Sequence, residues 1–300
     1  DDPLPFAIHY ESAAALEKPA DGLMQFGAEV EPGVTRGERF LAHMAYLADT
    51  YLTRPGYFRH GGRPVIVFYL VREWRDYGPY LERFREMMAE RGLDPYLVAD
   101  VVWWSEAVDA AWDWRTLGEH FDAVTGYSLY DPAQPTTMDG FLSGADEVFR
   151  EYRNVADAFG LDFAPSVLPG FDDRNLRGAE RPVIQRHGGE LYRRFWDLAE
   201  RHAGGERQLL FVTSFNEWHE GTELEPSAEH GTEYLMLTAS LKQRDRPRHG
   251  AGGPDVEREV DYLASRLDPD VGLIPESTAG ARQVSLEGGE TVSVPLDRVF

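Results

Sequence analysis

Short apolar segments alternate with longer amphipathic ones between about residue 4 and residue 243 of the chain. The apolar segments hold few polar positions, which is typical of strands in a parallel sheet that is covered on both faces. The pattern therefore predicts six strands. They are expected at Leu4–Tyr10, Pro64–Leu70, Tyr96–Trp104, Phe121–Tyr127, Phe163–Leu168 and Gln208–Ser214.

The segments between these strands have the periodicity of amphipathic helices. From Tyr80 to Glu90, for example, apolar residues recur every three to four positions and so share one face of a helix. Strands that alternate with helices indicate βαβ units with right-handed crossovers. Helices are expected at Arg36–Thr50, Tyr77–Arg91, Ser105–His120, Gly144–Phe159, Gly188–Ala203 and Glu233–Gln243.

Six units of this kind are two fewer than a closed (β/α)8 barrel contains. We expect an α/β fold of the (β/α)8-barrel type that lacks its first two βα units. Because six strands cannot close an eight-stranded cylinder, a gap is expected between the strands that begin at residues 4 and 208. The alternative is an open doubly wound sheet, but no strand is followed by a glycine-rich phosphate-binding loop.

The alternating pattern ends near Arg244, where a stretch rich in arginine, glycine and proline begins. We expect a (β/α) barrel over residues 1–243, a linker over residues 244–254 and a small extension over residues 255–300. Within the extension, the pattern predicts a helix at Asp255–Leu267. It also predicts a hairpin whose strands flank the turn Glu287-Gly-Gly-Glu290.

Composition excludes several classes of function. The chain has 52 acidic and 30 basic residues and a net charge of −22, which disfavours nucleic acid and anionic membranes as partners. It has no cysteine, so disulfides, thiolate metal sites and cysteine nucleophiles are excluded. No apolar run is long enough to span a membrane. Composition leaves the oligomeric state open.

The amino-terminal end shows no signal-peptide pattern, and an apolar run already begins at residue 4. We therefore expect that the natural chain has further residues before Asp1. The cellular compartment stays open for the same reason.

The polar residues that follow the strands point to a paired-carboxylate site, because functional groups of a parallel barrel collect at the carboxyl ends of its strands. Glu217 and Glu220 come directly after the last apolar strand, with Trp218 and Gly221 beside them. Two glutamates three positions apart ordinarily lie on a solvated helical face. Here one carboxylate can be solvated and the other shielded by an aromatic ring, which separates the pKa values of an acid and a base.

Other catalytic arrangements are less well supported. The nucleophile motif G-x-S-x-G is absent. A metal site built from Glu217, His219, Glu220 and His230 is the weaker alternative, because the sequence has no H-E-x-x-H motif and no dense histidine spacing. We expect a site that uses neither a metal nor another cofactor.

Three stretches carry a resemblance to a known family. The sequence SFNEWHEGTELEP at Ser214–Pro226 closely resembles the W-N-E-W-H-E-G-T-x-I-E-P signature of glycoside hydrolase family 99, the endo-α-mannosidases and endo-α-mannanases. Phe215 stands where that family usually has tryptophan. Pro165–Arg174 is similar to the P-S-V-x-P-G-Y-D-D segment, and His230–Leu235 is similar to the Y-G-x-x-Y-L that follows. The resemblance covers about residues 4–243.

The resemblance implies a (β/α)8 barrel that hydrolyses α-mannosides with net retention and without a metal. It places the base on Glu217, which would take the proton of the substrate 2-hydroxyl so that this oxygen closes onto C1 as a 1,2-anhydro sugar. It places the acid on Glu220, which would protonate the leaving oxygen and then act as base for water. This scheme is a neighbouring-group exception to the usual two-carboxylate hydrolysis.

The resemblance also implies a set of substrate-binding residues. Glu11 and Tyr127 match family residues near the reacting sugar, although a helix cap for Glu11 and core packing for Tyr127 are the alternatives. Asp173 is expected either to bind sugar hydroxyls or to cap a helix. The remaining members of the set are Asn216, Trp218, His219 and Glu225, of which Asn216 and Glu225 are expected to hold the two glutamates in place.

The expected partner is α-mannan or another oligosaccharide that contains mannose. The alternative function is a glycan-binding domain of polysaccharide metabolism, either non-catalytic or associated with a glycosyltransferase.

Overall fold

A computed structural model describes residues 4–20, 22–102, 113–130, 134–205 and 208–244, together with two short strands nearer the carboxyl terminus. The chain divides into two compact units, Asp1–Arg246 and Pro247–Phe300. Within the second unit, β13 (Ala281–Ser285) and β14 (Thr291–Pro295) pair in antiparallel fashion. The helix predicted at 255–267 and the linker beyond Arg244 lie outside the described residues. The predicted domain limits stay a prediction.

The first unit contains a row of parallel strands in the order of the chain. The order is β1–β6–β8–β9–β10, and β11 pairs separately with β12. These strands are β1 (Ile8–Tyr10), β6 (Arg63–Phe68), β8 (Tyr96–Asp100), β9 (Ala123–Thr125), β10 (Asp162–Phe163), β11 (Ser166–Val167) and β12 (Phe211–Val212). Each predicted strand segment contains at least one of them. The α/β class with a mostly parallel sheet is therefore confirmed.

The fifth predicted strand, Phe163–Leu168, is divided into β10 and β11 around Pro165. Before the proline, the Ala164 N–H donates to the Val124 carbonyl of β9, at 2.9 Å. After it, the Phe211 N–H of β12 donates to the Pro165 carbonyl, also at 2.9 Å. Successive residues of a parallel strand face opposite neighbours, so Asp162 and Ala164 bond toward β9 while Pro165 faces β12 and lies outside the first ladder. The segment therefore lies between the two strands.

Several short strands flank this row. The pair β2 (Met24–Gln25) and β7 (Trp74–Arg75) is parallel, while β3 (Glu29–Glu31) with β4 (Val34–Thr35) and β5 (Arg59–His60) with β6 are antiparallel. The predicted strand Leu4–Tyr10 is shorter than expected, because only Ile8–Tyr10 pairs with β6, while Phe6 makes an isolated bridge to Tyr57.

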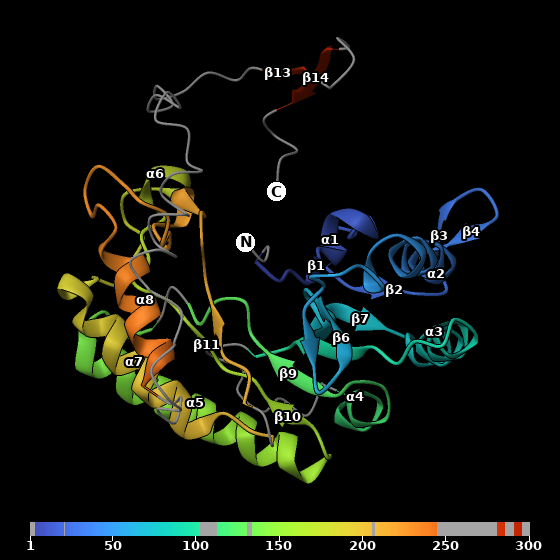
Figure 1. The fold of residues 1–300 in the computed structure, drawn as a ribbon, viewed down its shortest axis with the longest axis horizontal. Coiled ribbons are helices and arrows are strands. Elements are labelled where there is room, and N and C mark those ends of the chain that lie inside the picture. Colours follow the sequence, from blue (N-terminus) through green and yellow to red (C-terminus); the bar gives the residue numbers. More distant parts are fainter. Residues whose placement is uncertain are drawn as a thin grey trace. The chain divides into compact units, whose positions relative to one another are not determined.

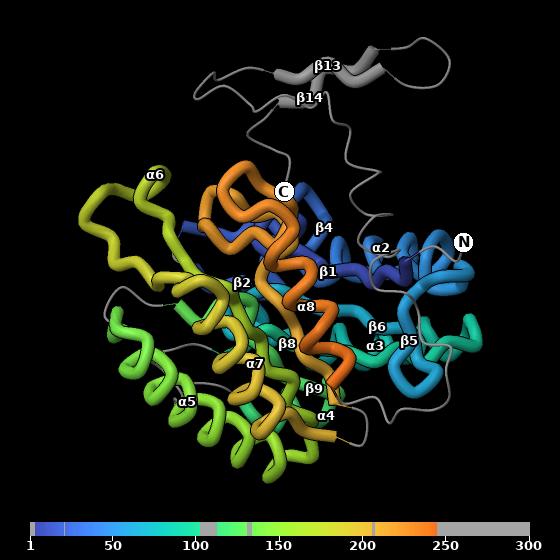
Figure 2. Tube along the Cα trace, turned by 60° about the vertical axis from the view of Figure 1, so that its left-hand side comes forward, coloured from blue at the N-terminus to red at the C-terminus, as the bar shows by residue number. Residues whose placement is uncertain are grey.

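Helices cover the sheet on its outer side. In Figure 1, α2, α3 and α4 lie on one side of the strands and α5, α7 and α8 on the other. Figure 2 shows the last three side by side. The helices are α1 (Ser12–Ala15), α2 (Arg36–Leu47), α3 (Gly78–Glu90), α4 (Trp114–His120), α5 (Met138–Ala158), α6 (Arg174–Arg177), α7 (Glu190–His202) and α8 (Glu233–Gln243).

Capping decides where two of these helices begin. Helix α5 begins six residues before the predicted start, because the Thr137 side chain accepts the Gly140 N–H and caps the helix there. Helix α2 begins with a capping box between Thr35 and Glu38. It continues as a π-helical turn, Ala48–Leu52, so the predicted helix Arg36–Thr50 extends two residues further than expected. Within the described residues, no helix has the length and apolar character needed to cross a bilayer.

The two faces of the sheet are packed differently. Phe68 of β6 points to the helix side, where Phe40 of α2 packs on it, on Phe26 and on Trp74 with ring centroids 5.6–5.8 Å apart. On the opposite face, Val65, Val67, Tyr96, Val98 and Ala123 form a second apolar cluster.

Residues of the last strand segment, Leu209 and Phe211, pack against this second cluster. Leu209 and Phe211 lie far from β6 and β8 along the chain. The contact therefore shows that early and late strands of the first unit face the same apolar interior. Among the described strands, β1 pairs with β6 and β12 pairs with β11, and no pairing joins β1 to β12.

Truncation of Phe40, the ring that packs on the helix side of the sheet, tests this packing. We expect Phe40→Ala to lower the free energy of unfolding by about 3–5 kcal/mol, since it opens a cavity beside the rings of Phe26, Phe68 and Trp74. Tyr46→Ala is the matched control, because Tyr46 lies on the same helix with 60% of its surface exposed. Equal losses for the two variants in urea unfolding would contradict the described packing.

Candidate functional site

The segment that follows β12 folds back on itself and is closed by hydrogen bonds. The Ser214 N–H donates to the Thr222 carbonyl at 3.0 Å, and the two hydroxyl groups lie 2.8 Å apart. The Glu217 N–H donates to the Ser214 hydroxyl at 2.8 Å. A single 3-10 turn, Trp218–Glu220, follows. The two predicted catalytic glutamates therefore lie at the two ends of one short, fixed turn.

Glu220 has the environment of a carboxylic acid that keeps its proton. Its side chain is 16% exposed, and its Oε1 accepts a hydrogen bond from Arg177 Nη1 at 3.4 Å. Its Oε2 is buried and has no hydrogen-bond partner among the described residues. Burial raises the pKa of Glu220 above its ordinary value, Arg177 opposes this shift, and the charge of Glu217 adds to it.

Tyr127, just after β9, lies within electrostatic reach of both glutamates. Burial raises the pKa of its hydroxyl, and the charges of Glu220 and then Glu217 raise it further. Its ring stacks on His9 with centroids 6.1 Å apart and meets Tyr69 edge-on at 5.6 Å. Residues at the ends of β1, β6 and β9 thus form an aromatic wall beside the turn that carries the two glutamates.

The backbone of Tyr127 joins several strand ends. Its carbonyl accepts hydrogen bonds from the hydroxyls of Ser166 on β11 and Thr213, which follows β12. Its N–H donates to Asp100 Oδ1 at 3.2 Å. These contacts explain how segments far apart in sequence arrive at one site.

Sequence reasoning did not single out Asp100. The residue is 1% exposed, and its carboxylate accepts the Leu70 N–H at 3.0 Å and an N–H of Arg72 at 3.4 Å. Burial raises the pKa of Asp100, and Arg72 opposes that rise. The available signal was an aspartate inside an otherwise apolar strand segment.

Glu11 caps a helix, one of the two roles that the sequence left open. Its carboxylate accepts the N–H groups of Ala13 at 3.2 Å and Ala14 at 2.6 Å, at the start of α1. A contact between Glu11 and substrate stays a prediction.

Asp173 is fully buried and engaged by arginines. Both of its carboxylate oxygens accept a hydrogen bond from Arg181 Nε at 3.1 Å. Its Oδ2 also accepts hydrogen bonds from Arg181 Nη2 at 2.7 Å and from Arg177 Nη1 at 2.8 Å. Burial alone would raise the pKa of Asp173, but hydrogen bonds from Arg181 and Arg177 hold it below its usual range. Asp173 therefore orients arginines in this structure.

Aromatic side chains on the same turn face the solvent. Trp218 is 48% exposed and Phe215 is 44% exposed. The Trp218 indole donates to Glu225 Oε2 at 2.9 Å, so Glu225 orients this ring. Asn216 and His219 are also exposed, and the Asn216 carbonyl accepts the Trp218 N–H. This set presents apolar ring faces and polar groups together, as carbohydrate binding requires.

Arg186 holds the far side of the turn and was not identified from the sequence. Its Nη2 donates to the carbonyls of Gly221 at 2.9 Å and Glu223 at 3.0 Å, and it also lies 2.8 Å from Glu223 Oε1. The guanidinium stacks over Tyr234 of α8 at 4.5 Å. The turn is thereby fixed to the helical layer.

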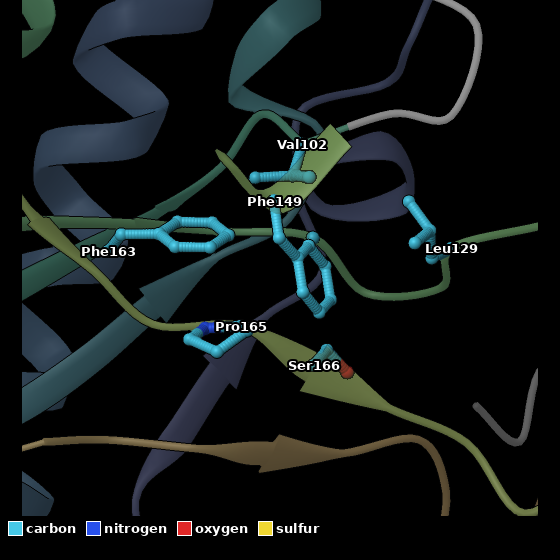
Figure 3. A pocket seen from close by; sticks show the side chains of 7 residues that line it. Val102, Leu129, Phe149, Phe163, Pro165 and Ser166 are labelled. Atoms are coloured by element: carbon cyan, nitrogen blue, oxygen red, sulfur yellow. The ribbon is translucent and has the colours of Figure 1, made fainter. Parts of the chain in front are cut away.

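A small apolar crevice lies under the backbone of Tyr127. Figure 3 shows Phe149, Phe163, Leu129 and Ser166 around it. It has no room for a water molecule, so it is a packing feature rather than a substrate pocket. Gly126 lines it, and a Cβ atom there would lie 2.6 Å from the Val102 carbonyl oxygen, so the close approach requires glycine.

The described part of the chain contains no group of three or more histidine, aspartate or glutamate side chains arranged to hold a metal ion.

Comparison with known proteins identifies a family model and several relatives of this chain. Residues 35–238 match the family model described as Glycosyltransferase WbsX. The mouse Glycoprotein endo-alpha-1,2-mannosidase-like protein is 26% identical over 219 residues, which are 66% of this chain and 44% of that protein. The chain spans less than half the length of the curated relatives it matches.

Two solved structures share the fold. A glycoside hydrolase-like protein superposes with a TM-score of 0.64 at 18% identity, covering 79% of this chain and 70% of that one. The GH99 endo-alpha-mannosidase from Bacteroides thetaiotaomicron superposes with a TM-score of 0.50 at 21% identity, covering 72% of this chain and 64% of that one.

The raised pKa of Glu220 predicts a pH-dependent effect on stability. Above the ordinary glutamate value of 4.5, the unfolded chain loses this proton while the folded chain keeps it, so stability falls as pH rises toward the folded-state pKa. We expect Glu220→Gln to raise the free energy of unfolding by about 1 kcal/mol at pH 7 and to leave it unchanged at pH 4. Urea unfolding at both pH values measures this, and a loss at pH 7 would contradict it.

Proposed function

The chain belongs to the WbsX family, and from that membership, together with the site, we propose that it is a glycoside hydrolase that cleaves α-mannosidic linkages. The predicted likeness to glycoside hydrolase family 99 is confirmed by the relatives and by the shared fold. The observation that carries the proposal is the turn after β12. It presents two glutamates, one of which has a buried oxygen with no hydrogen-bond partner in the described part of the chain.

Each glutamate has a distinct role in the proposed reaction. Glu217 takes the proton of the sugar 2-hydroxyl, and that oxygen attacks C1. The bond from C1 to the leaving oxygen breaks as Glu220 gives its proton to that oxygen. A 1,2-anhydro sugar results. Water then adds at C1 as Glu220 takes its proton, and Glu217 returns a proton to the 2-oxygen, so two inversions give net retention.

The environments of the two residues support this division. A buried carboxyl with a raised pKa holds a proton for the leaving oxygen at a pH where an ordinary glutamate has lost it. Tyr127 lies beside both groups, and the exposed rings of Phe215 and Trp218 offer apolar faces for sugar rings. Asn216, His219 and Glu225 complete the proposed substrate-binding set, with Glu11 and Asp173 at its margins.

The proposed substrate is α-mannan or another oligosaccharide that contains mannose, in keeping with relatives that are named endo-alpha-1,2-mannosidases. We further propose that residues 4–243 supply six βα units of a (β/α)8-type barrel. The strand order and the interior cluster that late strands share with early ones support this arrangement.

A second candidate function follows from the family description, which names a glycosyltransferase. This candidate is a glycan-binding domain of polysaccharide metabolism, either non-catalytic or associated with a glycosyltransferase. Such a domain would bind mannosides without releasing new reducing ends.

Substitution of the two glutamates tests the hydrolase. We expect Glu217→Gln and Glu220→Gln each to lower kcat on α-mannan oligosaccharides by about 10²–10⁴-fold, because each removes a proton-transfer group. The measurement is the release of reducing ends. Glu229→Gln is the control, since Glu229 follows the same turn in the chain and its side chain is 83% exposed.

Undiminished turnover in either glutamine variant of the pair would overturn the assignment of roles. Glycan binding with no release of reducing ends by the unmodified chain would favour the binding domain. Activity that is unaffected by EDTA would dismiss a metal-dependent reaction.

A further inference from the structure

Glu220 is contacted by a pair of residues from the segment that contains α6. One Nη1 nitrogen of Arg177 lies 2.8 Å from Asp173 Oδ2 and 3.4 Å from Glu220 Oε1. Asp173 is fully buried and is also bound by Arg181, whose guanidinium stacks over Tyr130 at 5.0 Å. A single nitrogen of Arg177 therefore bridges the buried Asp173 and the acid Glu220.

The backbones of the two segments are joined at the same place. The Asp172 N–H donates to the Glu220 carbonyl at 2.7 Å. Gly221, at a φ of +60°, lies so close that a Cβ atom there would be 3.1–3.2 Å from backbone and side-chain atoms of Asp172. The position of Arg177 relative to Glu220 is therefore set by main-chain contacts as well as by its own side chain.

We propose that Arg177, held by Asp173, is a positioning residue that makes Oε2 of Glu220 the atom from which the proton is transferred. This inference rests on the proposed role of Glu220 as the acid. Arginine only donates hydrogen bonds, so the oxygen that accepts from Arg177 is the carbonyl oxygen of the protonated acid. The hydroxyl is then Oε2, which is buried and has no partner among the described residues.

An unpartnered buried hydroxyl needs an acceptor, and the leaving oxygen of a bound glycoside is one. In the proposed complex, the leaving oxygen supplies the hydrogen-bond acceptor that Oε2 lacks. If Arg177 were free to rotate, either oxygen of Glu220 could carry the proton, and fewer of the protonated molecules would present it to the substrate.

Asp173 has a second effect on the acid. Arg177 lies closer to Asp173 than to Glu220, and the negative charge of Asp173 opposes the effect of Arg177 on the acid. Without Asp173, the guanidinium could form a close ion pair with Glu220 and favour its ionised form. The other charged or titratable groups that face Glu220 are Glu217 on its own turn, Tyr127 after β9 and Tyr69 after β6.

The first test measures the protonation of Glu220 directly and requires no turnover. The 300-residue chain is labelled with ¹³C at glutamate carboxyl groups, and the Glu220 signal, assigned by its loss in Glu220→Gln, is titrated by NMR. We expect the midpoint to move to higher pH in Arg177→Gln, which loses a cation. We expect it to move to lower pH in Asp173→Asn, which releases Arg177 toward Glu220.

Arg174→Gln is the matched control, because Arg174 lies on the same short helix and pairs with Asp172, at 2.7 Å. Its midpoint should equal that of the unmodified chain. Midpoints that stay unchanged in both Arg177→Gln and Asp173→Asn would overturn the inference. If Asp173→Asn does not fold, the half-exposed Arg177 still provides a variant that decides the question.

The second test separates proton donation from binding. The two substrates are α-mannotetraose and α-mannobiosyl fluoride, whose fluoride leaving group needs little protonation. We expect Arg177→Gln to lower kcat on the oligosaccharide by about 10–100-fold with KM nearly unchanged, and to lower kcat on the fluoride by less than about 3-fold. Arg177→Lys, which keeps a donor and a charge, should recover part of the loss.

Equal losses on the two substrates would show that Arg177 acts on substrate binding or on folding, and would overturn the inference. An unmodified chain that cleaves neither substrate would instead overturn the proposed function. In that case the NMR titration still decides whether Arg177 and Asp173 control Glu220.

Discussion

The hydrogen-bonded junction at Tyr127 is the contact on which the site depends. Its carbonyl binds the hydroxyls of Ser166 and Thr213, and its N–H binds the buried carboxylate of Asp100. Parallel strands bring their carboxyl ends to one edge, but they do not by themselves align those ends. The junction ties β8, β9, β11 and β12 together, so that the aromatic wall and the turn with the two glutamates face each other.

Two buried carboxylates near this junction show how neighbours determine acidity. Asp173 and Glu220 are both largely withdrawn from water, yet the pKa of Asp173 is lowered and that of Glu220 is raised. The difference lies in the arginines, since Asp173 binds two guanidinium groups closely while Glu220 has one at longer range.

The polar turn after β12 is supported by apolar layers on both sides of the sheet. The helix-side layer is built around Phe40, and the inner layer joins Val65 and Val67 to Phe211 at the start of β12. Arg186 then fixes the turn to α8 through Tyr234. Because the strands and helices beside the turn are already held by these apolar layers, the turn can carry exposed aromatic and charged side chains without an apolar core of its own.

The sequence by itself determined the order of strands and helices and the position of the two glutamates. Helix α8 coincides with its prediction, and the turn was found because its motif is contiguous. Periodicity and motifs are local properties, so they can be read along one segment. The tertiary structure alone decided the division of the fifth strand at Pro165, the burial of Asp100 and Asp173, and the contact of Arg177 with Glu220. That contact joins residues 43 positions apart, and it exists only because β11 and β12, which precede the two segments, pair with each other.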